Sequence, residues 1–158
     1  MMADNSTNSS ARGAWTFSPG DLAKDGWESV VDGSIDGWEH TGLRVANLEA
    51  EQTLTLPDAP VERIVIPLVG SFTVSYRESG AEPVVQTLEG RRSVFHGPSD
   101  VLYLGASCEA RIEGSGRFAV AEAPTSEVLP AVYVPRESVA IELRGSGRNS
   151  RQVHNFGT

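Results

Sequence analysis

Residues 63–76 read RIVIPLVGSFTVSY, and the first half of this stretch is almost continuously apolar. A short apolar run of this kind predicts a strand that is buried on both faces. Pro67 within it indicates a sheet edge or a bulge, because proline cannot donate a ladder hydrogen bond. From Ser71 to Tyr76 apolar and polar residues alternate, which predicts a strand with one buried face. Gly70 lies between the two runs and permits a turn.

Similar short runs recur on both sides of this stretch, separated by Pro, Gly, Ser and Asp. They occupy residues 42–46, 52–56, 84–85, 93–95, 101–104, 110–112, 118–120, 132–134 and 139–143. Their spacing is typical of a sandwich or a barrel. No window keeps an apolar helical period for three turns, and short helical turns are expected only near residues 19–22 and 135–138. The sequence therefore predicts an all-β domain.

The two ends of the chain differ in composition from the part between them. Residues 1–13 (MMADNSTNSSARG) have neither a basic start nor an apolar run, so we predict a disordered polar tail and not a secretory signal. Residues 14–143 carry the predicted strands and form the expected barrel domain. Residues 144–158 (RGSGRNSRQVHNFGT) are polar and locally basic, which predicts a linker that leads to another domain.

Charge and cysteine content exclude several classes of protein. The chain has 13 basic and 21 acidic residues and a formal net charge of −8. Proteins that bind nucleic acid neutralise phosphates with Lys and Arg, so this balance argues against a nucleic-acid partner. No apolar run approaches the roughly 18 residues of a membrane span, so no membrane association is expected. Cys108 is the single cysteine, which excludes an internal disulfide, and we expect a cytoplasmic protein.

The histidines do not form a recognisable metal-binding motif. His40, His96 and His154 lie far apart, without a His-x-His or His-x-x-x-His pair. A histidine-rich metal site needs two or three imidazoles with a carboxylate close in space. We therefore predict no metal site in this chain, and we interpret the three residues as a surface, a turn and a linker histidine.

Motifs for nucleotide binding and hydrolysis are also missing from the sequence. A hydrolase could in principle combine His96 and Asp100 with Ser99 or Ser107, but no Gly-x-Ser-x-Gly elbow supports that hypothesis. The sequence assigns no catalytic residue by motif.

Two further groups of residues admit both a functional and a structural interpretation. Guanidinium groups pair bidentately with carboxylates, so Arg148 and Arg151 could bind the carboxylate of an acidic sugar. The alternative is that they are solvated or contact a partner domain. Tryptophan could stack on a sugar ring, but packing in a core or an interface is the favoured interpretation for Trp15, Trp27 and Trp38.

Several motifs resemble one enzyme family in the same order along the chain. They are GWEHTGLRV at 37–45, RIVIPLVGSFTV at 63–74, GRRSVFHGPSD at 90–100 with LYL at 102–104, and ELRGSG at 142–147 followed by SRQV at 150–153 and Asn155-Phe156. These stretches are similar to the 5-deoxy-glucuronate isomerase family, the cupin isomerases of myo-inositol catabolism. The last of them resembles the inter-domain segment of that family, and the resemblance covers the chain from about Trp15 to its end.

The resemblance implies the N-terminal half of a bicupin, a cupin-type jelly-roll β-barrel whose C-terminal partner barrel is missing. In such families a divalent metal is held in the C-terminal barrel by a His-x-His pair, a Glu and a further His. The corresponding places here read Pro-Asp-Ala at 57–59 and Cys-Glu-Ala at 108–110, and Glu62 alone lies close to the carboxylate position. The resemblance therefore carries over no catalytic or metal residue, and no cofactor is expected in this chain.

The implied reaction converts 5-deoxy-D-glucuronate to 5-dehydro-2-deoxy-D-gluconate, an intramolecular aldose–ketose isomerisation. It needs a metal to polarise the carbonyl and a base to move a proton. We therefore expect the chain to be inactive alone, to pack against the C-terminal cupin domain, and to take part in a homo-oligomer that acts on a small sugar acid. The alternative is a stand-alone, non-catalytic cupin module that binds a small sugar acid in its barrel mouth.

Overall fold

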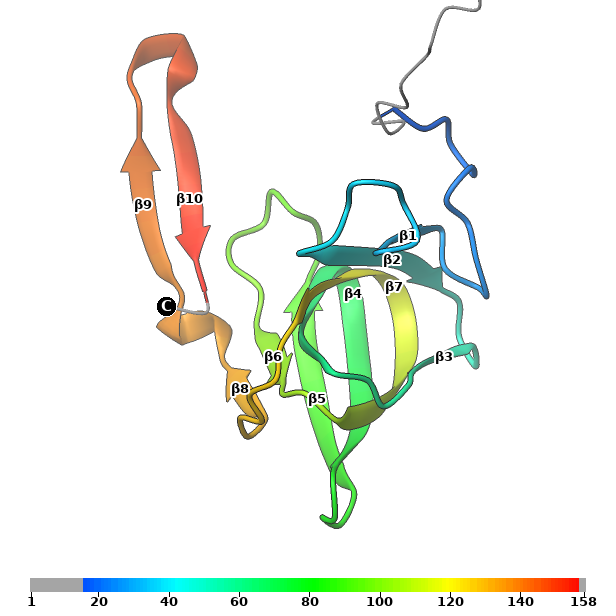
Figure 1. The fold of residues 1–158 in the computed structure, drawn as a ribbon. Coiled ribbons are helices and arrows are strands. Elements are labelled where there is room, and N and C mark those ends of the chain that lie inside the picture. Colours follow the sequence, from blue (N-terminus) through cyan, green and yellow to red (C-terminus); the bar gives the residue numbers. More distant parts are fainter. Residues whose placement is uncertain (1–15, 157–158) are drawn as a thin grey trace, which may run out of the picture.

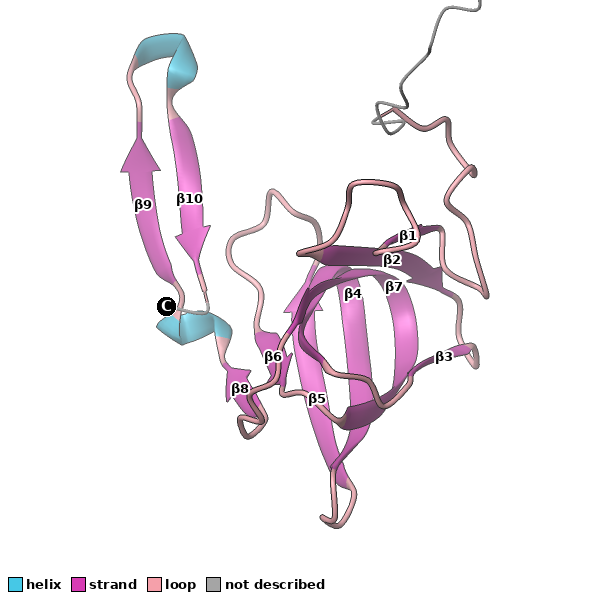
Figure 2. Ribbon diagram, viewed as in Figure 1, coloured by secondary structure: helices cyan, strands magenta, loops and turns pink. Residues whose placement is uncertain are grey.

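The computed structural model describes residues 16–156, which form a β-barrel with a hairpin beside it (Figures 1 and 2). The frame of the barrel is a pair of long antiparallel strands, β4 (Val61–Glu78) and β7 (Cys108–Pro124), of 18 and 17 residues. They pair from Val61 opposite Pro124 to Glu78 opposite Cys108. Both strands curve around the barrel, so a single strand pair contributes to both sides of it (Figure 1).

The bend in these two strands lies at a β-bulge. The register between them shifts between Pro67 and Val69, which confirms the bulge predicted at Pro67. Gly70 has a φ of +91°, and a Cβ there would lie 2.0 Å from the carbonyl oxygen of Ser115. Gly116, directly opposite Gly70, has a φ of +123° and an equally close backbone neighbour. Glycine therefore allows both the sharp bend and the close approach of the two backbones.

The turn that Gly70 would permit does not form, and the division of residues 110–120 into two separate strands is wrong. Backbone pairing with β7 continues across Gly70, and pairing with β4 continues across residues 114–116. The glycines bend the strands without ending them, because the opposite strand supplies hydrogen-bond partners on both sides of the bulge.

Because of the bend, each long strand belongs to two layers. The first half of β4 and the second half of β7 lie in one layer, in the order β1 (Ser29–Val31), β2 (Gly42–Leu48), β7, β4, β6 (Val101–Leu104) and β8 (Val132–Val134). In the other layer, β3 (Thr53–Leu56) pairs with the first half of β7, and β5 (Val84–Arg91) with the second half of β4. The predicted all-β, cupin-type jelly-roll barrel is confirmed.

Aromatic and aliphatic side chains from both layers fill the barrel. The ring of Phe118 is central, with its centroid 5.0 Å from that of Phe72 and 5.6 Å from that of Trp27. All three side chains are buried, as are the inward-facing Val65, Val74 and Val120. The packing role predicted for the tryptophans is therefore confirmed at Trp27.

Residues 140–155 form a hairpin, which contains most of the segment predicted as a polar linker at 144–158. Strand β9 (Ala140–Arg144) pairs antiparallel with β10 (Arg151–Asn155), and the 3-10 turn η2 (Gly147–Asn149) lies between them. The backbone groups of β10 find partners in β9, which gives this polar segment regular structure. A connection from it to another domain stays a prediction.

The predicted domain bounds of 14–143 enclose every strand of the barrel sheet and most of β9. Pairing within the barrel sheet ends at Val134, and the 3-10 turn η1 (Arg136–Ser138) follows, where a helical turn was predicted. The predicted tail at residues 1–13 lies outside the described residues. Within the described part, no helix has the length and apolar character needed to cross a membrane.

Candidate functional site

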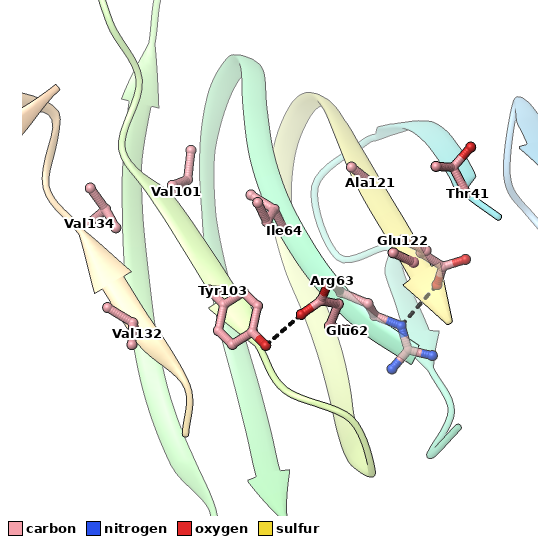
Figure 3. A pocket seen from close by; sticks show the side chains of 11 residues that line it. Thr41, Glu62, Arg63, Ile64, Val101, Tyr103, Ala121, Glu122, Val132 and Val134 are labelled. Atoms are coloured by element: carbon pink, nitrogen blue, oxygen red, sulfur yellow. Dashed lines mark hydrogen bonds and ion pairs between the residues drawn. The ribbon is translucent and has the colours of Figure 1, made fainter. Parts of the chain in front are cut away.

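A groove crosses the outer face of the layer that contains β8, β6, β4 and β7 (Figure 3). In β4, Val65 points into the barrel, so its neighbour Ile64 points outward. Ile64 lies opposite Tyr103 of β6 and Ala121 of β7, which therefore share this outer face. The apolar part of the groove is lined by Ile64, Val101, Ala121, Ala123, Val132 and Val134.

The polar pair on the floor of this groove is Tyr103 and Glu62. The hydroxyl of Tyr103 donates a 2.8 Å hydrogen bond to Oε2 of Glu62. Burial, this hydrogen bond and the negative charge of Glu62 together raise the pKa of Tyr103 to about 12. The phenol therefore remains protonated at neutral pH and acts as a hydrogen-bond donor, not as a base.

The end of the groove meets a buried ion pair that belongs to the barrel interior (Figure 3). Nε of Arg63 lies 2.8 Å from Oε1 of Glu122, with side-chain exposures of 2% and 6%. The guanidinium also donates from Nη1 to the carbonyl oxygen of Cys108 (3.0 Å) and from Nη2 to that of Pro57 (2.9 Å). Its donors therefore have acceptors on three sides, as a buried charge requires.

A second arginine extends this ion pair toward the surface. Nε of Arg44 donates to the other carboxylate oxygen of Glu122 at 2.9 Å, so the carboxylate lies between two guanidinium groups. Nη2 of Arg44 is 3.9 Å from Asp32, and its guanidinium carbon lies 5.8 Å from the ring centroid of Trp27. The network thus joins β2, β4 and β7 at one end of the barrel.

The residues at this end of the barrel do not fit a divalent cation. The family resemblance would place metal-binding histidines near residues 57–59 and 108–110, and the guanidinium of Arg63 bridges these two segments through the carbonyls of Pro57 and Cys108. The positively charged side chain of Arg63 therefore already occupies the place between these two segments. Among residues 16–156, no group of three or more His, Cys, Asp or Glu side chains is arranged to hold a metal ion.

The cysteine and histidine side chains near these segments are not poised as ligands either. Burial, with a contribution from the charge of Glu78, raises the pKa of the Cys108 thiol to about 11, which disfavours the thiolate that binds metals. His40 and His96 are exposed in different loops. His154 lies on β10, where its Nε2 is 3.0 Å from the side-chain oxygen of Gln152. The structure does not bring the three histidines into one site.

Asp100, a member of the hypothetical hydrolase triad, has a structural role. Its buried carboxylate accepts hydrogen bonds from the backbone N–H groups of Glu89 (2.7 Å) and Gly90 (2.8 Å) and from the hydroxyl of Tyr133 (2.9 Å). It therefore ties β5 to β8. No hydrogen bond or ion pair joins it to His96 within the described residues, so the geometry does not support the hydrolase interpretation.

Arg148 and Arg151, the two residues proposed to bind a sugar carboxylate, lie at the far end of the hairpin. Arg148 is in η2 and Arg151 begins β10, and both are exposed. Nη1 of Arg151 is 3.5 Å from the carbonyl oxygen of Asn149. The turn between β9 and β10 lies apart from β4, β6, β7 and β8, the strands that carry most of the groove (Figure 1). Both arginines therefore lie at or next to the turn of the hairpin, and among the described residues no hydrogen bond or ion pair joins either to another candidate group.

Sequence reasoning missed Arg63 and Glu122. Both are charged residues at inward-facing positions of otherwise apolar alternations, two residues before Val65 and two after Val120. They also lie directly opposite each other in the register of β4 and β7. Charges of opposite sign at inward positions of two strands were the signal that could have revealed a buried pair.

Comparison with known proteins links the chain to one family. Residues 17–158 match the model of the KduI/IolB family. A 5-deoxy-glucuronate isomerase of Geobacillus kaustophilus is 29% identical over 122 residues, which are 76% of this chain and 43% of that protein. The isomerase of the same name from Halalkalibacterium halodurans is 33% identical over 78 residues, 48% of this chain and 29% of that one.

A solved structure supports the same relationship. The crystal structure of an IolB-like protein from Salmonella typhimurium LT2 superimposes with a TM-score of 0.71 at 31% identity, over 84% of this chain and 50% of that one. The chain thus spans less than half the length of the isomerase from G. kaustophilus.

Proposed function

This chain belongs to the KduI/IolB family, and we propose that it supplies one barrel of an enzyme that isomerises 5-deoxy-D-glucuronate to 5-dehydro-2-deoxy-D-gluconate. The observation that carries the proposal is the agreement of the family match with relatives named 5-deoxy-glucuronate isomerase. In this proposal the enzyme is an intramolecular aldose–ketose isomerase of myo-inositol catabolism that works in the cytoplasm.

The reaction needs a group that polarises the aldehyde and a base that moves a proton from the neighbouring carbon. A divalent metal bound elsewhere in the enzyme would supply the first, as a Lewis acid. In this chain the corresponding place is taken by Arg63, whose guanidinium is held by Glu122 and two backbone carbonyls. We therefore assign the metal and the catalytic base to a second, C-terminal cupin domain, and to this barrel a supporting role.

This assignment makes the C-terminal domain the main partner of the barrel, and the substrate a small sugar acid. Membership of a homo-oligomer is part of the same proposal. Arg148 and Arg151 would bind the substrate carboxylate only if the assembly brings the hairpin tip to the active site. Replacing both by Ala in the assembled enzyme tests this, because loss of a substrate contact raises KM several-fold.

The decisive experiment measures isomerisation by NMR with the 158-residue chain alone and with the chain fused to the remaining half of a relative, each with Mn²⁺, Zn²⁺ or Fe²⁺. We expect no turnover from the chain alone and metal-dependent turnover from the fusion. Metal-dependent turnover by the isolated chain would contradict the division of roles. A well-folded but inactive fusion would contradict the isomerase assignment.

The alternative, a stand-alone module that binds a sugar acid in the barrel mouth, receives less support from the geometry. Among the described residues, the buried polar side chains are Arg63, Ser99, Asp100 and Glu122. The guanidinium of Arg63 already donates to three acceptors, and the carboxylate of Asp100 already accepts three hydrogen bonds. Calorimetric titration of the isolated chain with D-glucuronate tests this alternative. Binding abolished by Arg63→Met in a folded variant would favour it.

A further inference from the structure

The hairpin of β9 and β10 carries its two exposed large apolar side chains, Ile141 and Leu143, on one face. In its register Leu143 lies opposite Gln152 and Ile141 opposite His154, so these four side chains share a face. Leu143 is 85% exposed and Ile141 51% exposed. On the other face Glu142 accepts hydrogen bonds from Arg144 (2.8 Å) and Asn155 (2.6 Å). Ile141 and Leu143 are therefore open to solvent, whereas the carboxylate of Glu142 already accepts two hydrogen bonds.

A two-stranded hairpin on its own is at best marginally stable in water. This one stands beside the barrel as a separate two-stranded sheet, and all five residues of β9 are exposed (Figure 1). Burial of Ile141 and Leu143 against another surface would supply the missing apolar contact. The hairpin therefore has the properties of a docking arm.

The groove described above is an apolar surface of complementary character on the same chain. Val132 at its edge is 49% exposed, so the hairpin of the same molecule does not cover it. The strand β8 that carries Val132 pairs only with β6 among the described strands. Apolar patches of this kind on both the arm and the groove mark interaction surfaces.

The charges of the two surfaces are also complementary. Of the 13 basic and 21 acidic residues in the chain, three arginines and one glutamate lie in the hairpin, which leaves ten basic and twenty acidic residues elsewhere. No ion pair within residues 16–156 engages Arg148 or Arg151 at the hairpin tip. The same holds for Glu62 in the groove and for Glu127, whose charge acts on Tyr103. A basic arm thus complements an acidic body. Glu62 in the groove is in no ion pair within residues 16–156, whereas Glu122 at the end of the groove is paired with Arg63 and Arg44.

We propose that two copies of this chain associate by exchanging hairpins, with the Ile141–Leu143 face of each arm seated in the Ile64–Val132 groove of the other copy. The exchange is reciprocal, so it closes as a two-fold symmetric dimer. It pairs apolar face with apolar groove and the arginine-bearing tip with the carboxylates of Glu62 and Glu127. The exchange specifies the homo-oligomer that is part of the proposed function, and because its test measures mass and not turnover, its failure is distinguishable from failure of the isomerase assignment.

The mass in solution tests the exchange. Light scattering after size-exclusion chromatography, at micromolar concentration, should give about twice the 16.9 kDa of one chain. Leu143→Asp on the arm and Val132→Asp in the groove should each weaken the dimer about tenfold or more, as loss of central contacts does. Val85→Asp is the matched control, because Val85 is 65% exposed on β5 and lies outside both surfaces, and it should leave the dimer intact.

Mixing the two variants distinguishes arm exchange from other dimers. The Leu143→Asp variant has an unaltered groove, and the Val132→Asp variant has an unaltered arm. A mixed dimer can therefore form one arm–groove contact between unaltered surfaces, which neither variant can form alone. Dimer should therefore reappear in the equimolar mixture. Circular dichroism and the unfolding midpoint of each variant establish that it is folded, and Ile141→Asp replaces any arm variant that is not.

Three results would overturn the proposal. The first is a wild-type chain that is monomeric in solution. This outcome includes a monomer whose groove binds the remaining half of a relative. The second is a dimer that persists in both aspartate variants, or that Val85→Asp disrupts equally. The third is a mixture of folded variants without recovery of dimer, which would point to contact between like surfaces.

Discussion

Arg63 and Glu122 lie directly opposite each other in the register of β4 and β7, and the Nε of Arg63 is 2.8 Å from Oε1 of Glu122 inside the barrel. The pair is shielded from water, since both side chains are almost completely buried. Removing one partner of such a pair leaves the other buried charge with too few partners, whereas removing both does not. A single substitution in this pair should therefore lower the free energy of unfolding more than substitution of both residues.

Arg63→Met should destabilise the fold by about 3–5 kcal/mol, because it leaves Glu122 with Arg44 alone and leaves the carbonyls of Pro57 and Cys108 without their donor. The double variant Arg63→Met/Glu122→Leu should recover part of that loss. Urea unfolding followed by tryptophan fluorescence measures both. The control is Arg77→Met, which removes an exposed ion pair with Glu109 and should cost about 1 kcal/mol or less. Equal losses for Arg63→Met and Arg77→Met would contradict the buried role of Arg63.

Tyr103 and Tyr133 make the free energy of unfolding depend on pH in the alkaline range. Burial, with hydrogen bonds to Glu62 and Asp100, raises the pKa of Tyr103 and of Tyr133 to about 12, from an unfolded value of 10.0. Between these values the folded chain retains protons that the unfolded chain releases. The stabilisation is therefore complete below about pH 10 and is lost as the pH rises through about 12.

Titration of phenolate absorbance checks this pH dependence. We expect Tyr103 and Tyr133 to ionise only as the chain unfolds at high pH, and all three tyrosines to ionise together in guanidinium chloride. Tyr103→Phe should remove one of the late-titrating groups. Ionisation of every tyrosine near the unfolded value in the folded chain would be the contrary result.

The barrel corner depends on glycine at particular positions. A Cβ on Gly116 would lie 2.1 Å from the carbonyl oxygen of Val69, so Gly116→Ala must displace one of the two long strands. We expect a loss of about 2 kcal/mol or more. Gly80 also has a positive φ, of +75°, but a Cβ there would have no neighbouring atom within 4 Å, so Gly80→Ala should cost only about 1 kcal/mol. Comparable unfolding midpoints for the two variants would contradict the close approach at the corner.

The same corner shows how far the sequence could predict the fold. Apolar alternation placed most strands, and Pro67 indicated the bulge, because these signals are local. Gly70 and Gly116 looked like turn residues, since a glycine between two apolar runs has the same appearance whether the chain reverses or bends. Only the pairing of β4 with β7 across the corner decides between the two, and that pairing joins residues distant in the sequence.

The candidate site was harder to predict for a related reason. Arg63 reads as the polar start of an apolar run, and Glu122 as one acid among many. Their significance depends on the register that sets them opposite each other. The histidines were candidates because imidazole is a common metal ligand and acid–base group. The structure places His40, His96 and His154 in three separate segments and does not bring them into one site. The hairpin was missed because its sequence is polar and its two strands stabilise each other through backbone pairing.

Substitution of Asp100 distinguishes a structural role of its carboxylate from a catalytic one. Its buried carboxylate holds the backbone of β5 at Glu89 and Gly90 and the hydroxyl of Tyr133. Asp100→Ala should therefore lower the free energy of unfolding by about 3 kcal/mol or more, because three donors lose one charged acceptor. Tyr133→Phe removes only one of these hydrogen bonds and should cost about 1–2 kcal/mol.

The matched control for Asp100→Ala is His96→Ala, which should leave stability unchanged because His96 is exposed. A serine-directed fluorophosphonate should not label the wild-type chain. Labelling that depends on both His96 and Asp100 would restore the hydrolase interpretation. Destabilisation by Asp100→Ala without any labelling would instead fix the role of this carboxylate as the tie between β5 and β8.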